Sequence, residues 1–486
     1  MAMQQLRLLF HHSLLLQHRN LAFWKLLVLA AGLVLASLIF FTYSSTAASR
    51  LLPDSGLSFA GANNQNAHGN SDLDNSACLV DLNLLRLHVG NSSTVDYARL
   101  NIGAARTDNF TAFEDSLDVS MPPYRTVHLD TGASPIPAPR PDASHMVFGV
   151  ATSLQKLEDS LDAFAHWASN TNAHIVAVVE QGGSSTRTCV QQRADELGIR
   201  LTITQTEDDR LDRYFSLIHV LYQHQEALMT QWAVLMDDNT FFPSMRNLVA
   251  RLAFYDASIP QYIGGMTEDL ARLSGVGYVA YGGAGIFLSI PLLEDLQYVF
   301  ETCHSLKDKG DRMLASCIYA HTSAKFTRER GLYQLDLHGD ASGFFESGRP
   351  LPLSVHHWRS WFQADMVALG KVADICGDEC LLRRFHLSKS KDWFLINGYS
   401  IIQDATLWNE PRPMEQTWEK SKYQGSNPFA YSLGPLRRLD PDKVSFQLKD
   451  AVQETGRDQV RQVYVFKGTG EKPPRVLEVA WTVVQE

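Results

Sequence analysis

The sequence has no excess of basic residues. It contains 43 Lys and Arg against 53 Asp and Glu, which gives a formal net charge of −10 at pH 7. Lys and Arg also form no strong cluster with interleaved aromatic residues, as they do in proteins that bind nucleic acid. We therefore expect no nucleic-acid partner. The length of 486 residues exceeds what one hydrophobic core usually serves, so more than one folded unit is expected.

Acidic residues are absent from the first 53 positions. Within this segment residues 26–43 are almost entirely apolar, and residues 21–24 extend the run across Lys25, whose amine can reach the headgroups. Three basic residues precede the run and only Arg50 follows closely, which favours a cytosolic N-terminus. The pattern predicts a cytosolic tail at 1–20, a transmembrane signal-anchor helix at 21–43 and single-pass type II topology.

A cleaved signal peptide is the alternative, supported by the small residues at 46–48. The apolar run is longer than the roughly 7–15 residues of a signal-peptide core, which favours the uncleaved anchor. The rest of the chain would then lie in the lumen of the Golgi or the ER. Two N-glycosylation acceptors, Asn91-Ser92-Ser93 and Asn109-Phe110-Thr111, fall on that side.

Cysteine is scarce, and none precedes position 78. The chain has six cysteines, and an even number in an oxidising compartment predicts disulfides. Buried free thiols are the alternative. Cys303 with Cys317 and Cys376 with Cys380 are close enough in sequence to close small loops. The second pair has no matching partner pair elsewhere, which argues against a zinc site.

Composition divides the remaining chain into four segments. Residues 44–75 are rich in Ser, Ala, Gly and Asn and have little to bury, which predicts a flexible stem. A lumenal N-terminal segment, 76–142, ends in the proline-rich stretch 135–141. The domain predicted to be catalytic covers 143–412. A small β-rich extension follows at 413–486.

Strand-like and helix-like runs alternate in the predicted catalytic domain. Continuous apolar runs typical of buried strands alternate with amphipathic runs typical of helices, and this alternation predicts an α/β domain with a mostly parallel sheet covered by helices. The predicted strands are 145–152, 173–180, 200–204 and 232–236, and the predicted helices are 154–167 and 211–228.

The strand at 232–236 ends in Asp237, Asp238 and Asn239. In open α/β sheets ligands bind at the carboxyl ends of the strands, so these side chains are candidates for a cation and phosphate site. The alternative is a plain turn, because Asp and Asn bond their own backbone there. Thr152 and Ser153 end the first strand, another usual position for nucleotide contacts.

A dinucleotide-binding fingerprint is lacking. The Gly275-x-Gly277-x-x-Ala280 spacing resembles one, but a strand-like stretch follows where a helix should begin. The glycine turn at 282–285 instead indicates close approach of the backbone to a ligand or a neighbouring strand.

Two further positions are candidates for chemistry. Asp311 lies at the start of a predicted helix, where it is either a cap or a functional acid. His356 and His357 end a short strand-like run, and at most one of them would enter a site if that strand continued.

These motifs together resemble glycosyltransferase family 31, the fringe and β-1,3-galactosyltransferase group, and most closely its fungal branch. The match spans roughly residues 145–405. The segments that carry it are Val234 to Ser244, Tyr281 to Gly285, Gly310-Asp311, Leu353 to Trp358 and Ile396 to Ser400.

The resemblance implies a GT-A-type Rossmann-like fold and a UDP-sugar donor. It implies that Thr152, Ser153, Asp237, Asp238 and the turn Gly282, Gly283, Ala284 and Gly285 bind the donor. It further implies Mn²⁺ on Asp238, Asn239 and His356, with His357 the less favoured ligand. Asn239 replaces the family's third Asp and brings no charge, so metal affinity should fall.

The mechanism implied is a direct displacement with inversion. Asp311 would act as general base on a hydroxyl of a glycan or glycoprotein acceptor. The alternative function is a catalytically silent relative that binds glycan or a partner protein, and Asn239 is its main support.

Overall fold

The computed structural model divides the chain into two compact units, residues 1–75 and 76–486. The residues that it describes all lie in the second unit: 79–90, 103–106, 125–130, 139–181, 184–226, 229–305, 310–362, 364–386, 393–404, 413–420, 427, 429–453, 459–469 and 475–483. The predicted tail, anchor, stem and both glycosylation acceptors lie outside the described residues. No helix among the described residues is both long and apolar enough to span a membrane.

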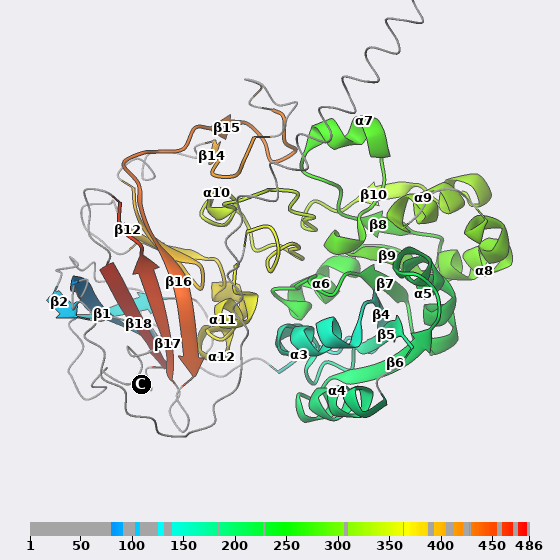
Figure 1. The fold of residues 1–486 in the computed structure, drawn as a ribbon, viewed down its shortest axis with the longest axis horizontal. Helices are drawn as coiled ribbons and strands as arrows, with labels where there is room; N and C mark the ends of the chain where they lie inside the picture. The colour runs from blue at the N-terminus through cyan, green and yellow to red at the C-terminus, as the bar shows by residue number, and fades with distance from the viewer. Residues whose placement is uncertain are drawn as a thin grey trace, which may run out of the picture. The chain divides into compact units, whose positions relative to one another are not determined.

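A seven-stranded sheet forms the centre of the predicted catalytic domain (Figure 1). Four neighbouring strands are parallel, β9 runs antiparallel to β7 and β8, and β10 is parallel to β8. The mixed α/β fold with a mostly parallel sheet is therefore confirmed. In sheet order the strands are β10 (Phe326–Arg328), β8 (Tyr262–Gly264), β9 (Ile286–Ser289), β7 (Trp232–Met236), β4 (Met146–Ala151), β5 (His174–Glu180) and β6 (Arg200–Thr206).

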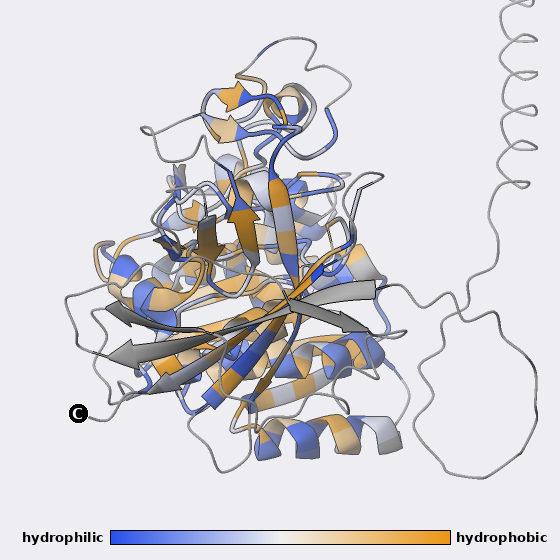
Figure 2. Cartoon of the chain, turned by 90° about the vertical axis from the view of Figure 1, so that its left-hand side faces the viewer, coloured by the Kyte–Doolittle hydropathy of each residue, from blue (hydrophilic) through white to orange (hydrophobic). Residues whose placement is uncertain are grey.

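Helices cover both faces of this sheet, because alternate strand residues point to opposite sides. On β4, Phe148 and Val150 join one hydrophobic cluster and Val147 joins the other. The first cluster includes residues of α3 (Leu154–Ala168), α4 (Ser184–Glu196) and α6 (Met245–Leu252). The second includes residues of α5 (Arg210–His224), α8 (Ile290–His304) and α9 (Gly310–His321). Figure 2 shows hydrophilic and hydrophobic residues side by side on the helices, as this packing requires.

The C-terminal strands belong to a second, nine-stranded sheet. The predicted extension supplies β16 (Val444–Gln453), β17 (Gln459–Phe466) and β18 (Arg475–Val483). β16 pairs with β13 (Ser400–Gln403), so the predicted boundary at 412 runs through this sheet. The sheet also contains β11 (Arg384–His386), β12 (Trp393–Ile396), β1 (Leu79–Gly90), β2 (Gly103–Arg106) and β3 (Arg125–Asp130). A small two-stranded sheet pairs β14 (Met414–Glu415) with β15 (Leu436–Arg437).

A buried ion network joins the second sheet to the segment after α10 (Ser342–Phe345). Lys443 Nζ lies 3.0 Å from Glu346 Oε2 and 2.7 Å from Glu415 Oε2, and all three side chains are buried. Glu346 also accepts a hydrogen bond from the Ser400 hydroxyl at 2.7 Å. Buried charges need such partners, since an unpaired one is costly. The network therefore helps to hold the second sheet against the domain predicted to be catalytic.

Both short-range disulfides are present. Cys303–Cys317 connects α8 to α9, and Cys376–Cys380 closes a tight loop. Asn397, from one of the segments that resembles family 31, donates to the Cys380 carbonyl at 3.0 Å. That segment forms the hairpin between β12 and β13.

Candidate active site

The residues after β7 form a turn that is anchored to the glycine turn. The Asp237 N–H donates to the Thr240 hydroxyl at 3.1 Å, and this hydroxyl donates to the Gly283 carbonyl at 2.9 Å. The Asp237 carbonyl accepts from the Thr240 N–H at 3.1 Å. The segment is thus a turn as well as a candidate site. Thr240 was not predicted as part of it.

Asp238 faces the end of the first strand. The Thr152 hydroxyl donates to Asp238 Oδ2 at 2.6 Å, and Lys156 Nζ lies 4.0 Å from the same oxygen. The Thr152 carbonyl in turn accepts from the buried Arg213 side chain at 2.7 Å. The structure therefore brings together Thr152 and Asp238, two residues predicted to bind the donor. Ser153 caps α3 by accepting from the Lys156 N–H.

The glycine turn, a 3₁₀ segment η2 (Gly282–Ala284), has no room for side chains at its first two positions. A Cβ atom on Gly282 would lie 2.2 Å from the Tyr214 hydroxyl and 3.0 Å from Asp311 Oδ1. A Cβ atom on Gly283 would lie 2.2 Å from His356 Nδ1. The glycines are needed because the backbone passes between these side chains.

Asp311 lies in the first turn of α9 and faces Gly282. Burial, followed by the nearby Asp237 carboxylate, raises its pKa to about 6. A backbone hydrogen bond from Gly282, the Tyr214 hydroxyl and His356 act in the opposite direction. A carboxylate with a pKa near 6 is mostly ionised at neutral pH and is still a useful proton acceptor. Tyr214 was predicted only as an apolar position of a helix, and nothing in its sequence pattern indicated that its hydroxyl would lie here.

His356 meets the motif after β7. Its Nε2 lies 3.2 Å from Asp237 Oδ2, and its side chain is buried. The strand does not continue past it: Phe241 and Val355 form an isolated bridge, and His357 adopts a left-handed backbone with φ +59°. The alternation expected of a strand therefore does not apply, and the His357 ring lies 3.8 Å from the His356 ring.

Two of the residues predicted to hold Mn²⁺, Asp238 and His356, have different contact partners in the structure. Asp238 contacts Thr152, whereas His356 contacts Asp237. Within the described part of the chain, no three His, Cys, Asp or Glu side chains are grouped as a metal site. A carboxylate and an imidazole nitrogen, with the half-buried Asn239 amide nearby in sequence, nevertheless form a donor set suited to a cation whose remaining ligands are diphosphate oxygens and water.

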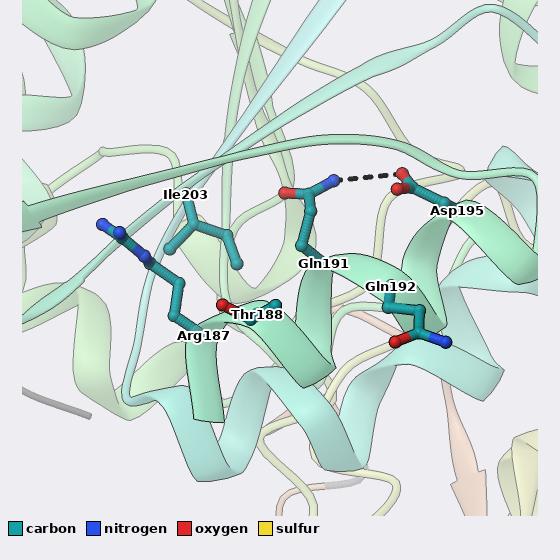
Figure 3. A pocket seen from close by; sticks show the side chains of 6 residues that line it. All are labelled: Arg187, Thr188, Gln191, Gln192, Asp195 and Ile203. Carbon is teal, nitrogen blue, oxygen red and sulfur yellow. Dashed lines mark hydrogen bonds between the residues drawn. The ribbon is translucent and has the colours of Figure 1, made fainter. Parts of the chain in front are cut away.

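A surface cavity of about 350 Å³ lies elsewhere, between α4 and β6 (Figure 3). None of the predicted site residues lines it. Its lining residues are Arg187, Thr188, Gln191, Gln192, Asp195 and Ile203.

Comparison with known proteins gives limited matches. A family model described as a protein of unknown function, DUF604, matches residues 276–363. This segment contains the glycine turn, Asp311 and His356 but is a minor part of the chain. No curated protein matches.

Solved structures that match include several glycosyltransferases. The galactosyltransferase LgtC with donor and acceptor sugar analogs is 8% identical, with a TM-score of 0.29, over 43% of this chain and 86% of that chain. Mouse xyloside xylosyltransferase 1 is 11% identical, with a TM-score of 0.28, over 44% and 96% of the two chains. The glycosyltransferase GlyE of Streptococcus pneumoniae is 12% identical, with a TM-score of 0.29, over 43% and 54%. At TM-scores below 0.5 these likenesses carry no argument about the chemistry of this chain.

Proposed function

We propose that this protein is an inverting glycosyltransferase that moves a sugar from a UDP-sugar to a hydroxyl group of a glycan or glycoprotein. One observation carries the proposal: the Asp311 carboxylate, with a pKa raised to about 6, lies beside Asp237 and His356, with Gly282 and Gly283 packed between them. Direct sugar transfer needs a general base close to a site that can bind the diphosphate of the donor.

Asp311 acts as the general base in this proposal. Its carboxylate takes the proton from the acceptor hydroxyl while the hydroxyl oxygen forms a bond to the anomeric carbon. The bond from that carbon to the phosphate oxygen breaks, and UDP leaves with the electron pair. A single base suffices because the leaving diphosphate needs no proton from a second carboxylic acid, unlike the leaving group of an inverting glycosidase.

The donor lies at the ends of β4 and β7. Thr152, Ser153, Asp237, Asp238 and the turn Gly282, Gly283, Ala284 and Gly285 contact it. Asp237 and His356, together with the predicted ligands Asp238 and Asn239, would hold a divalent cation such as Mn²⁺, which when bound would neutralise charge on the departing diphosphate. Placement as a type II protein in the lumen of the Golgi or ER agrees with the two disulfides, which persist in oxidising compartments.

Release of UDP from a panel of UDP-sugars tests the proposal. The purified full chain is incubated with Mn²⁺ and UDP-galactose, UDP-N-acetylglucosamine or UDP-glucose, with and without acceptor, and UDP binding is measured by calorimetry. Turnover with at least one donor is expected. If no donor is turned over and UDP does not bind, the proposal of glycosyltransferase activity is refuted.

A binding protein without catalysis is the second candidate. It is favoured by Asn239 at the third motif position and by the lack, among described residues, of three grouped acidic or histidine ligands. UDP binding with no turnover of any donor would support this alternative.

A further inference from the structure

Lys156 lies at the edge of the candidate active site. Its Nζ is 4.0 Å from Asp238 Oδ2, the carboxylate oxygen that also accepts from the Thr152 hydroxyl at 2.6 Å. The Lys156 side chain is 57% exposed, whereas that of Asp238 is 19% exposed. The ammonium group is therefore accessible to a ligand that approaches Asp238 from solvent.

The backbone of Lys156 is fixed, although its side chain is exposed. The Lys156 N–H donates to the Ser153 hydroxyl at 3.3 Å, and the Lys156 carbonyl accepts from the Ser160 hydroxyl at 2.7 Å. Ser160 Oγ in turn accepts from Nη1 of Arg359 at 3.3 Å, and Arg359 lies three residues after His356. These contacts hold the start of α3 between the end of β4 and the segment that carries His356. The fold therefore sets the position of Lys156 at this edge of the site.

The charges of the candidate site give Lys156 a role in donor binding. The diphosphate of a UDP-sugar is negatively charged and would be repelled by the Asp237 and Asp238 carboxylates. A divalent cation offsets this repulsion when it is bound, but the Asn239 amide adds no charge that would hold the cation. Lys156 offsets part of the repulsion without a cation, because its ammonium group lies beside Asp238. Its three N–H donors are available to phosphate oxygens, since 4.0 Å is beyond hydrogen-bond distance of Asp238.

We propose that Lys156 binds the diphosphate of the donor directly, and that UDP therefore binds to this site without a divalent cation. This inference rests on the proposed function, because it places the donor diphosphate beside Asp238. A Lys ammonium binds phosphate as a point charge through its N–H donors. The divalent cation, when bound, adds to this affinity but is not required for it.

A plain surface ion pair is the alternative role of Lys156. Exposed ion pairs contribute little to folding, so replacement of Lys156 should leave the fold intact in either case. The two roles differ in what they predict for ligand binding. A surface ion pair has no effect on UDP affinity, whereas a phosphate ligand affects UDP and spares uridine.

Calorimetry on the purified full chain in EDTA tests the inference, with UDP and uridine as the probes. The variants are Lys156→Gln, which removes the positive charge, and Lys156→Arg, which keeps it. Lys449→Gln, at an exposed lysine on β16, is the matched control. Thermal unfolding of each variant checks that the fold is preserved.

We expect UDP to bind the wild-type chain in EDTA, and Lys156→Gln to raise the Kd for UDP about five- to twentyfold. The Kd for uridine should stay within about twofold, because uridine has no phosphate to contact. Lys156→Arg and Lys449→Gln should bind UDP within about threefold of wild type. An unchanged Kd for UDP in Lys156→Gln would overturn the inference. An equal rise in the Kd for uridine would also overturn it, because Lys156 would then act only by supporting the strand end.

The comparison of EDTA with Mn²⁺ separates this inference from the proposed function. A wild-type chain that turns over a UDP-sugar with Mn²⁺ but binds no UDP in EDTA would refute the inference and leave the transferase intact. A wild-type chain that binds UDP in EDTA, loses this binding in Lys156→Gln and turns over no donor would support the diphosphate site and refute the transferase.

Discussion

His356 Nε2 lies 3.2 Å from Asp237 Oδ2 and thereby joins the segment after β7 to a segment far along the chain. Each residue alone has an ordinary explanation, Asp237 as part of a turn and His356 as a buried polar residue. Together, with Asp311 across the glycine turn, they form the candidate site in which we propose a carboxylate base and a pair of cation ligands. The predictions below test each part of this arrangement.

Removal of the His356 imidazole should weaken the binding of Mn²⁺. In His356→Ala the Mn²⁺ concentration for half-maximal activity should rise about tenfold or more, because one ligand of the pair is lost. His219→Ala, which removes an exposed histidine on α5, serves as the control and should behave as wild type. The same half-maximal concentration for both variants would place His356 off the metal.

Asn239→Asp should act in the opposite direction. A carboxylate restores the charge that the amide lacks, so the half-maximal Mn²⁺ concentration should fall about tenfold. Manganese titrations of wild-type and variant activity measure this. If the titrations coincide, Asn239 does not contact the cation.

Tyr214→Phe should shift the pH dependence of transfer. The Tyr214 hydroxyl lowers the pKa of Asp311, so its removal raises that pKa and moves the acid limb of kcat/KM upward from about pH 6. A hydrogen bond to a charged group contributes about 1.5–3 kcal/mol, which corresponds to a shift of about one to two pH units. Phe keeps the packing of α5, so folding should be preserved. An unshifted acid limb would show that Tyr214 does not act on Asp311.

Asp311→Asn should stabilise the protein at neutral pH. The pKa of Asp311 is raised from 3.8 to about 6 in the folded state, so native stability falls as the pH rises through that interval. Replacing the acid by an amide removes this loss. The free energy of unfolding should therefore rise by about 1–3 kcal/mol above pH 7 and change little below pH 4. Thermal unfolding at pH 4 and pH 8 measures the difference. Asp295→Asn, on the exposed side of α8, is the control, and equal shifts for both variants would contradict the assignment.

Gly283→Ala should damage both stability and activity. Its Cβ would lie 2.2 Å from His356 Nδ1, so the turn or the imidazole must move, at a cost of about 1–3 kcal/mol. Gly275→Ala is the matched control, because a Cβ there meets nothing within 4 Å. If Gly283→Ala keeps the melting temperature and the turnover rate of the wild type, the turn does not pack against His356 as described.

Four strands of the seven-stranded sheet, β4, β5, β6 and β7, were predictable from the sequence because they are strand-like runs that alternate with helix-like runs, whereas β8, β9 and β10 were not predicted. The run 232–236 coincides with β7, and the predicted helix 211–228 corresponds to α5 at Arg210–His224. Helix α4 was not predicted, because it is mostly polar and buries few residues, among them Val190 and Ala194. The second sheet was foreseen only as isolated C-terminal strands, since its pairing with β13 and β1 is long-range.

The site was predictable where motifs fall at strand ends and in the glycine turn. The fold brings Asp237, Gly283, Asp311 and His356 together. Tyr214 was not foreseen, because an apolar position on a helix gives no sign of where its hydroxyl lies. The backbone of His357 was also hidden, because no glycine marks the end of the strand.

The central claim is that Asp311 is the general base. The rate of sugar transfer by the Asp311→Asn variant tests this claim most directly. Calorimetry of UDP binding and the rate of sugar transfer are measured on the same preparation, with Asp295→Asn in parallel. The account predicts UDP binding within about twofold of wild type and transfer reduced by about a hundredfold or more, since general-base catalysis contributes about 10²–10⁴ in rate. Transfer at the wild-type rate in Asp311→Asn would contradict it.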